Sequence, residues 1–215
     1  MFPEEIQNYI TRGHEEVDIE YKASMTWQNR ETRLKILCAM LALSNHQDGG
    51  VIVIGVRDGD CEPIGMNDED YASFKYDDIA RVVKNHAEPF IEFKLLADTL
   101  EISGATRKFV VIQIREATEL STICTKLELW NTSAPSYNQN IALRQNAIYI
   151  RSKAPIESRE IASVHEWKEL IYRTIEKSER TLFKRLPSWM FESQNKEKSD
   201  TDKYNEDLKT DGLYE

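Results

Sequence analysis

The first sixty residues contain two short segments whose hydrophobic patterns predict strands. Residues 17–22 alternate apolar and polar side chains, which is typical of a strand with one face buried. Residues 51–56 (VIVIGV) are almost continuously apolar and are bounded by turn residues, as in a fully buried strand. Between them, residues 30–46 carry apolar side chains at helical spacing and stop just before a glycine pair, which predicts one long helix.

The rest of the chain continues this mixture of helices and strands. Further helices are predicted over residues 3–12, 68–86 and 157–185. Further strands are predicted over residues 91–102 and 108–115, joined by a hairpin turn, and over residues 147–151. Residues 118–146 show no clear period and predict no particular element. This order predicts an α+β domain with a mixed or antiparallel sheet and helices packed on it.

Composition indicates one globular domain with an acidic extension. Of the 215 residues, 40% are apolar and 30% are charged, which is enough for a hydrophobic core in a domain that we place at residues 1–190. Residues 191–215 are nearly free of apolar side chains and predict a disordered acidic tail.

The cellular compartment is predicted from three features that the sequence lacks: a membrane-spanning run, a secretory signal and paired cysteines. No apolar run approaches the roughly 18–20 residues that span a bilayer. The N-terminal residues do not have the pattern of a secretory signal. The three cysteines are far apart and form no CxxC pair, and the four histidines are equally scattered. We therefore expect a cytoplasmic protein with no membrane association, no disulfide and no zinc site.

Three acidic residues and one lysine are the candidate chemistry of this chain. In the first predicted strand, Glu20 and Lys22 project from the same face. Asp58 follows the apolar strand, where polar groups of neighbouring strands converge, and Glu15 can join Glu20 if the chain bends just before it. Such a cluster would hold Mg²⁺ or Mn²⁺ on carboxylate oxygens, with Lys22 stabilising the transition state of phosphodiester cleavage. The alternative is a solvated charge pair beside a turn aspartate, and spacing alone favours this simpler interpretation.

Basic residues are concentrated in one part of an otherwise acidic chain. The formal net charge is −9, but residues 142–191 hold ten bases and six acids, which permits contact with phosphates. The candidates for binding nucleic-acid phosphates are Arg57, Arg144, Arg151, Lys153, Arg173 and Lys177.

Three of these candidates have a simple alternative role. Arg57 could bind phosphate or pair with the neighbouring Asp58. The last helix carries a basic stripe at a spacing of three to four residues, which consists of Arg173, Lys177, Arg180 and Lys184 with Arg185 adjoining. Glutamates interrupt this stripe, which favours a solvated helix face over a nucleic-acid contact.

Several of these motifs together resemble a known family. The pattern E-x4-E-[FY]-K lies in 15-EEVDIEYK-22, the helix ends in 39-AMLALSN-45, and 49-GGVIVIGVRD-58 carries the strand and its aspartate. With the run 147-AIYIRSKAP-155, this ordered set resembles the Schlafen AlbA-like (Schlafen AlbA_2) domain in a short, single-domain member of the prokaryotic type. The resemblance covers roughly residues 4–175.

The resemblance implies an activity and a set of roles. It implies a metal-dependent endoribonuclease that cuts structured RNA, most of all transfer RNA, in a bacterial stress or antiphage response. Glu15, Glu20 and Asp58 match the acidic triad of the Schlafen ribonucleases, and Lys22 matches a family lysine near that centre. Those ribonucleases have two such lobes around a basic valley, whereas this chain has the length of one, so a homodimer is expected to complete the valley.

Two other functional classes remain open. Many bacterial members of this family are described as DNA-binding domains, so a non-catalytic DNA- or RNA-binding module, such as a transcription regulator, is the principal alternative. Its binding would depend on salt and survive loss of the acids, because carboxylates repel phosphate unless a metal lies between them. A third possibility is an interaction subunit of a larger complex, with the acidic tail as a docking or autoinhibitory segment.

Overall fold

The structure is a computed structural model, and it describes residues 2–118, 120–130 and 140–185, with side chains as far as residue 179. The chain divides into two compact units, Met1–Leu170 and Ile171–Glu215. The helices are α1 (Glu4–Thr11), α2 (Arg30–Ser44), α3 (Asp68–Ser73), α4 (Tyr76–His86) and α5 (Val164–Arg185). The strands are β1 (Ile19–Lys22), β2 (Gly50–Ile54), β3 (Ala87–Glu88), β4 (Phe93–Ile102), β5 (Ala105–Ile114), β6 (Ile123–Cys124), β7 (Glu128–Leu129), β8 (Ile141–Leu143), β9 (Tyr149–Lys153) and β10 (Ile156–Glu160).

Four strands form a mixed sheet in the order β1-β2-β5-β4. β1 runs parallel to β2, whereas β2 pairs with β5, and β5 with β4, in antiparallel fashion. Because parallel neighbours end at the same edge of a sheet, the last residue of β1, Lys22, lies opposite the last residue of β2, Ile54. The shorter strands pair in twos, as β3–β6, β7–β8 and β9–β10. The predicted α+β class with a mixed sheet is confirmed.

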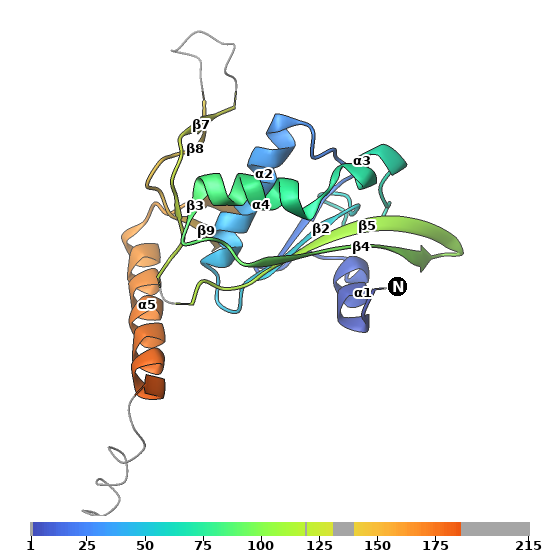
Figure 1. The fold of residues 1–215 in the computed structure, drawn as a ribbon. Coiled ribbons are helices and arrows are strands. Elements are labelled where there is room, and N and C mark those ends of the chain that lie inside the picture. Colours follow the sequence, from blue (N-terminus) through green and yellow to red (C-terminus); the bar gives the residue numbers. More distant parts are fainter. Residues whose placement is uncertain (1, 119, 131–139, 186–215) are drawn as a thin grey trace, which may run out of the picture. The chain divides into compact units, whose positions relative to one another are not determined.

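Alternation along the strands divides the hydrophobic core into two layers. On one face of the sheet, Val51 and Val53 pack in a cluster with residues of α1, and on the other, Ile52 packs in a cluster with residues of α2 and α4. Figure 1 shows α1 on one side of the sheet and α2 and α4 on the other. In β1, Ile19 and Tyr21 belong to the α1 layer, so the alternate positions of this strand face the α2 side.

Helix α2 is buried on almost every side because two different layers cover it. Ten of its 15 residues are buried. One side packs on the sheet, and the opposite side contacts β9 and β10, where Cys38 Sγ donates to the Ser158 carbonyl at 3.5 Å. Asn29 caps the first turn by accepting a hydrogen bond from the Glu31 amide at 2.8 Å. Just past the last turn, Asn45 donates to the carbonyls of Thr122 and Tyr149, which joins the helix to β9.

The segment predicted as one helix over residues 68–86 is two helices. Phe74 between them has an extended conformation, and its ring packs against Trp27 with ring centroids 5.9 Å apart. The Ser73 hydroxyl accepts a hydrogen bond from the Trp27 amide at 2.8 Å. This buried contact with a distant part of the chain breaks the helix, although the local pattern is continuous.

The prediction of a helix beginning at residue 157 is wrong, because residues 156–160 are strand β10. β10 forms a hairpin with β9, in which Ile156 lies opposite Lys153. The helix begins at Val164 with a capping box, in which the Glu166 amide donates to Ser163 Oγ at 3.2 Å and the Ser163 amide donates to Glu166 Oε2 at 3.0 Å. Polar side chains throughout β10 hide its strand character from a sequence pattern.

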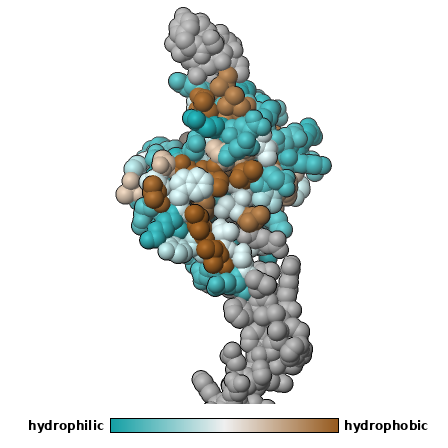
Figure 2. Space-filling model, turned by 90° about the vertical axis from the view of Figure 1, so that its left-hand side faces the viewer, coloured by the Kyte–Doolittle hydropathy of each residue, from teal (hydrophilic) through white to brown (hydrophobic). Residues whose placement is uncertain are grey.

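The surface combines polar and apolar side chains, as Figure 2 shows for one face. Among the residues described, no helix is both long enough and apolar enough to span a membrane. The tail predicted over residues 191–215 lies outside the described part of the chain.

Candidate active site

Glu20, Lys22 and Asp58 lie together beside the ends of β1 and β2. The Lys22 carbonyl accepts hydrogen bonds from the Gly55 and Val56 amides at 2.8 and 3.1 Å, which ties the end of β1 to the segment that leads to Asp58. Lys22 Nζ lies 2.6 Å from Glu20 Oε1 and 3.4 Å from Asp58 Oδ2. The lysine is therefore an ammonium bridge between two carboxylates that are 38 residues apart in sequence.

Glu15 reaches the same cluster because the chain bends before β1. Gly13 has a φ of 77°, a left-handed conformation that glycine adopts without strain. Beyond this bend, Glu15 Oε1 accepts a hydrogen bond from Arg151 Nη2 at 3.2 Å. Arg151 Nη1 also donates to Glu20 Oε2, so both glutamates bind one guanidinium group.

Arg151 lies on β9 and bonds both glutamates of the cluster from the protein interior. Its side chain is 0% exposed. Besides the two glutamates, its guanidinium donates to the backbone carbonyls of Val17 at 3.0 Å and Ile19 at 2.8 Å. These bonds fasten the segment that carries Glu15 and Glu20 to β9, so the positions of both acids depend on one buried cation.

The charges of the cluster shift two pKa values. Burial and the neighbouring Glu20 carboxylate raise the pKa of Glu15, even though Arg151 opposes this effect. Burial alone would lower the pKa of Lys22, but Glu20 and Asp58 outweigh it and raise that pKa above its usual value. With three acids against two bases, the cluster has a formal charge of −1.

The donor types of the cluster fit a hard divalent cation, since carboxylate oxygens are the ligands that Mg²⁺ and Mn²⁺ prefer. Both oxygens of Glu20 are engaged, however, one by Lys22 and the other by Arg151. In the part of the chain that the structure describes, no group of three or more His, Cys, Asp or Glu side chains is arranged to hold a metal ion. A cation would therefore enter the cluster only if Lys22 moved away from Glu20 and Asp58.

A family model for Schlafen, AlbA_2 matches residues 15–158, a range that begins at Glu15 and includes the whole cluster. The chain belongs to this family. The match extends over most of the chain, and it makes a nucleic-acid-related role the coarse functional assignment for this Schlafen AlbA_2 domain. No curated protein matches the sequence.

Comparison with solved structures adds a distant similarity. Sixteen chains match, and one of them is the DIP2311 protein from Corynebacterium diphtheriae. It shares 12% sequence identity with the Schlafen AlbA_2 domain, with a TM-score of 0.42. The aligned region covers 67% of this chain and 22% of that chain, so this protein spans about a fifth of the length of DIP2311.

The buried position of Arg151 corrects the expectation that it faces phosphates. A fully buried guanidinium that already bonds two carboxylates and several carbonyls has no surface to offer to a nucleic acid. One feature of the sequence points to this role: Arg151 directly follows the apolar run of residues 147–150, and a charged residue at a buried position requires a charged partner. The pattern does not identify that partner.

The other predicted phosphate-binding residues of the first unit are exposed and paired with acids. Arg57 contacts Asp60 at 2.6 Å, not Asp58. Arg144 contacts Glu160 at 3.2 Å and Lys153 contacts Glu169 at 3.4 Å. Arg173 and Lys177 belong to the second unit. The side chains of Arg180, Lys184 and Arg185 lie outside the described part of the chain.

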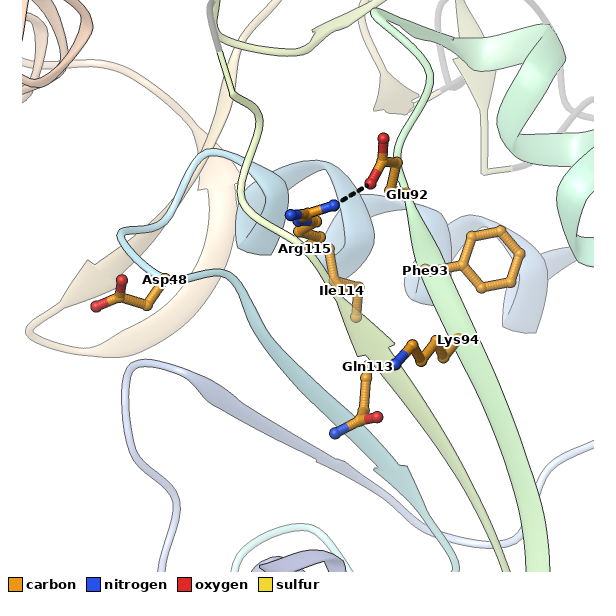
Figure 3. A pocket seen from close by; sticks show the side chains of 7 residues that line it. All are labelled: Asp48, Glu92, Phe93, Lys94, Gln113, Ile114 and Arg115. Carbon is orange, nitrogen blue, oxygen red and sulfur yellow. Dashed lines mark hydrogen bonds and ion pairs between the residues drawn. The ribbon is translucent and has the colours of Figure 1, made fainter. Parts of the chain in front are cut away.

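A cavity of about 550 Å³ lies elsewhere in the Schlafen AlbA_2 domain, where β4 begins and β5 ends. Figure 3 shows the side chains that line it, which are Asp48, Glu92, Phe93, Lys94, Gln113, Ile114 and Arg115. Arg115 pairs with Glu92 at 2.9 Å, and the cavity has two acids and two bases in all. Its charges are balanced, and it includes no residue of the acidic cluster.

Proposed function

We propose that this Schlafen AlbA_2 domain is a Mg²⁺- or Mn²⁺-dependent endoribonuclease that acts on structured RNA, with transfer RNA as its substrate class. The observation that supports this function is the convergence of three carboxylates on two cations, in which Lys22 pairs with Glu20 and Asp58 and Arg151 pairs with Glu15 and Glu20. Three carboxylates that lie close together repel one another, which costs free energy of folding. A cluster of this kind at a partly exposed edge is typical of a functional site.

In this proposal, Glu15, Glu20 and Asp58 hold the cation. When bound, the cation supplies Lewis-acid activation of water and neutralises charge on the phosphodiester. Burial and the neighbouring Glu20 carboxylate raise the pKa of Glu15, and a divalent ion would favour its ionised form because it removes the repulsion between the two carboxylates.

Lys22 and Arg151 have different roles beside the acids. Lys22 turns from the carboxylates toward the scissile phosphate, where its ammonium group stabilises the negative charge that develops in the transition state. Arg151 stays buried and keeps Glu15 and Glu20 in place through its fixed hydrogen bonds.

Exposed bases of the first unit are proposed to hold the RNA backbone. Arg57, Arg144 and Lys153 each pair with a carboxylate at the surface, and such pairs contribute little free energy. A phosphate can therefore replace the carboxylate at small cost. A homodimer would place two such surfaces against one RNA, which a single lobe of this size cannot grip alone.

A second candidate function, a non-catalytic nucleic-acid-binding module, is favoured by one specific observation. Lys22 and Arg151 already neutralise most of the acidic charge, as they would in a purely structural network. This candidate predicts binding that weakens with salt but does not change when the acids are neutralised.

The deciding experiment incubates the full chain with a transfer RNA pool, with and without Mn²⁺. Glu20→Gln and Asp58→Asn remove one ligand each, and Asp68→Asn is the matched control, because Asp68 is exposed and pairs with Lys108 outside the cluster. We expect Mn²⁺-dependent cleavage that falls by about 100-fold in the two cluster variants, since even indirect partners of a metal site contribute 10- to 100-fold. The control should cleave like the wild type.

Two results would reject the nuclease proposal. One is equal cleavage by Glu20→Gln, Asp58→Asn and the wild type. The other is no cleavage by any of these proteins, combined with salt-dependent RNA binding that all of them share, which would establish the binding module. Thermal unfolding of each variant identifies any that lose activity because they do not fold.

A further inference from the structure

A second cavity, of about 390 Å³, lies where the beginning of α2, the helix α4 and the segment before β7 meet. It is separate from the acidic cluster, with which it shares no residue. The charged residues that line it are Arg30, Arg33, Asp78, Arg81, His86, Lys126 and Glu128. Four of these are arginine or lysine and two are acidic, so the cavity carries excess positive charge in a protein with a net charge of −9.

The single glutamate at the base of this cavity is shared by three basic side chains. Glu128 contacts Arg30 at 2.6 Å, Lys126 at 2.9 Å and His86 at 3.0 Å. Burial alone would raise the pKa of Glu128, but hydrogen bonds from Lys126, His86 and Arg30 outweigh it and lower that pKa to about 2. Glu128 is therefore ionised, and one negative charge faces several positive ones.

His86 lies between two hydrogen-bond acceptors at this cavity. Its Nδ1 lies 2.7 Å from the Val82 carbonyl, and its Nε2 lies 3.0 Å from Glu128. These two contacts hold the imidazole ring between α4 and Glu128.

Arg33 and Arg81 have donors available for a ligand. Arg33 Nη1 donates to the backbone carbonyls of Gln28 at 3.0 Å and Trp27 at 3.4 Å, and within the described residues no carboxylate pairs with this guanidinium. Arg81 is 71% exposed, and its ion pair with Asp78 is 3.2 Å long. A guanidinium group binds a phosphate through two parallel hydrogen bonds, which a surface carboxylate at this distance does not prevent.

We propose that this cavity binds the phosphate of a nucleotide, with Arg33, Arg81 and Lys126 as the residues that contact it. Its volume is within the range of small-ligand sites. The side chains of Leu34 and Val82 line it and provide an apolar surface for the nucleoside. A free mononucleotide and the phosphorylated end of an RNA both carry a phosphate group that these residues could bind. The inference does not depend on RNA cleavage at the acidic cluster.

Isothermal titration of the full chain at low salt tests the site with defined probes. The probes are inorganic phosphate, adenosine 5′-monophosphate, and one short RNA with either a 5′-phosphate or a 5′-hydroxyl. Arg33→Gln and Arg81→Gln should each weaken binding of adenosine 5′-monophosphate by about tenfold, the loss of one charged hydrogen bond. The matched control is Arg115→Gln in the balanced cavity of Figure 3, which should bind like the wild type.

The substitution Asp78→Asn should change the affinity for adenosine 5′-monophosphate in the opposite direction. It removes an acid of the cavity without removing a base, so binding of adenosine 5′-monophosphate should become tighter. A variant that is merely unfolded cannot bind more tightly, so this measurement separates charge from folding. Equal binding of the free nucleotide and the 5′-phosphorylated RNA supports a mononucleotide site, and binding of the phosphorylated RNA alone supports an RNA-end site.

Three results would overturn the inference. The first is no binding of any probe at millimolar concentration. The second is weakening in Arg115→Gln equal to that in Arg33→Gln. The third is loss of adenosine 5′-monophosphate binding in Glu20→Gln, which would mean that the acidic cluster and this cavity are not independent. A failure of RNA cleavage leaves these measurements unaffected.

Discussion

Arg151 on β9 and Glu20 on β1 form a buried ion pair that joins two segments 131 residues apart in sequence. The same guanidinium also binds Glu15 at 3.2 Å. An arginine expected at the surface is therefore the internal support of the acidic cluster. It acts as a positioning residue, because it holds the candidate metal ligands and is itself inaccessible.

Replacing Arg151 by methionine should destabilise the protein strongly. The substitution removes one of the two cations that pair with the buried Glu20 and the cation that pairs with Glu15, and breaking a buried ion pair in this way typically costs about 3–5 kcal/mol. We expect urea denaturation to show that decrease in the free energy of unfolding. Arg144→Met is the control, because Arg144 is 58% exposed and its ion pair with Glu160 contributes less than about 1 kcal/mol. Equal stability of the two variants would contradict the supporting role.

Neutralising Glu15 should stabilise the protein at neutral pH. The pKa of Glu15 is raised in the folded state, so its ionised form is less favourable there than in the unfolded chain. The stability of the wild type is therefore expected to decrease as the pH rises through this raised pKa. Glu15→Gln should unfold at a higher urea concentration than the wild type at pH 7, and the difference should vanish below about pH 4, where Glu15 is protonated in both states. A variant less stable than the wild type at pH 7 would contradict this expectation.

Removing the ammonium group of Lys22 should separate metal binding from catalysis. Lys22→Met frees one oxygen of Glu20 and the side chain of Asp58, so Mn²⁺ should bind more tightly than to the wild type. RNA cleavage should nevertheless be lost, because Lys22 is proposed to stabilise the transition state. Titration of Mn²⁺ by calorimetry and the cleavage assay measure the two effects. Unchanged Mn²⁺ affinity would show that Lys22 and the metal do not compete for the carboxylates.

Glu128 should contribute stability that acid removes. Its pKa falls from an ordinary 4.5 to about 2, and its side chain is 14% exposed. A shift of this size corresponds to at most about 3 kcal/mol at pH 7, a contribution present above pH 4.5 and lost as the pH falls toward 2.

The measurement compares Glu128→Gln with the wild type by urea denaturation at pH values between 7 and 3. The loss of stability should be constant down to about pH 5 and then shrink. Asp68→Asn is the control, since Asp68 is exposed and pairs only at the surface with Lys108 in the described structure. A loss that stays constant to pH 3 would show that the ionised form of Glu128 is not what stabilises the fold.

Much of the fold follows from local patterns in the sequence. The alternation in residues 17–22, the apolar run at 51–56 and the helical spacing in 30–46 predict β1, β2 and α2 with small errors at their ends. These elements are predictable because each buries its side chains with a period that the chain itself displays.

The elements that the sequence does not predict depend on contacts with distant segments. Strands β6 and β7, in the unassigned stretch 118–146, have two residues each, too few to display a period. β10 carries polar side chains because it is a hairpin partner of β9, and the break at Phe74 exists because that ring packs on Trp27. In each case tertiary packing outweighs the local preference.

For the candidate site, the sequence by itself determined which acids are available and that Glu20 and Lys22 share a face. Only the tertiary structure decided that β1 and β2 are parallel neighbours, that Glu15 turns inward, and that Arg151 lies beneath the two glutamates. The physical reason is that periodicity encodes which face of an element is buried, whereas the partner of a buried charge is chosen by whichever distant segment the fold brings against it.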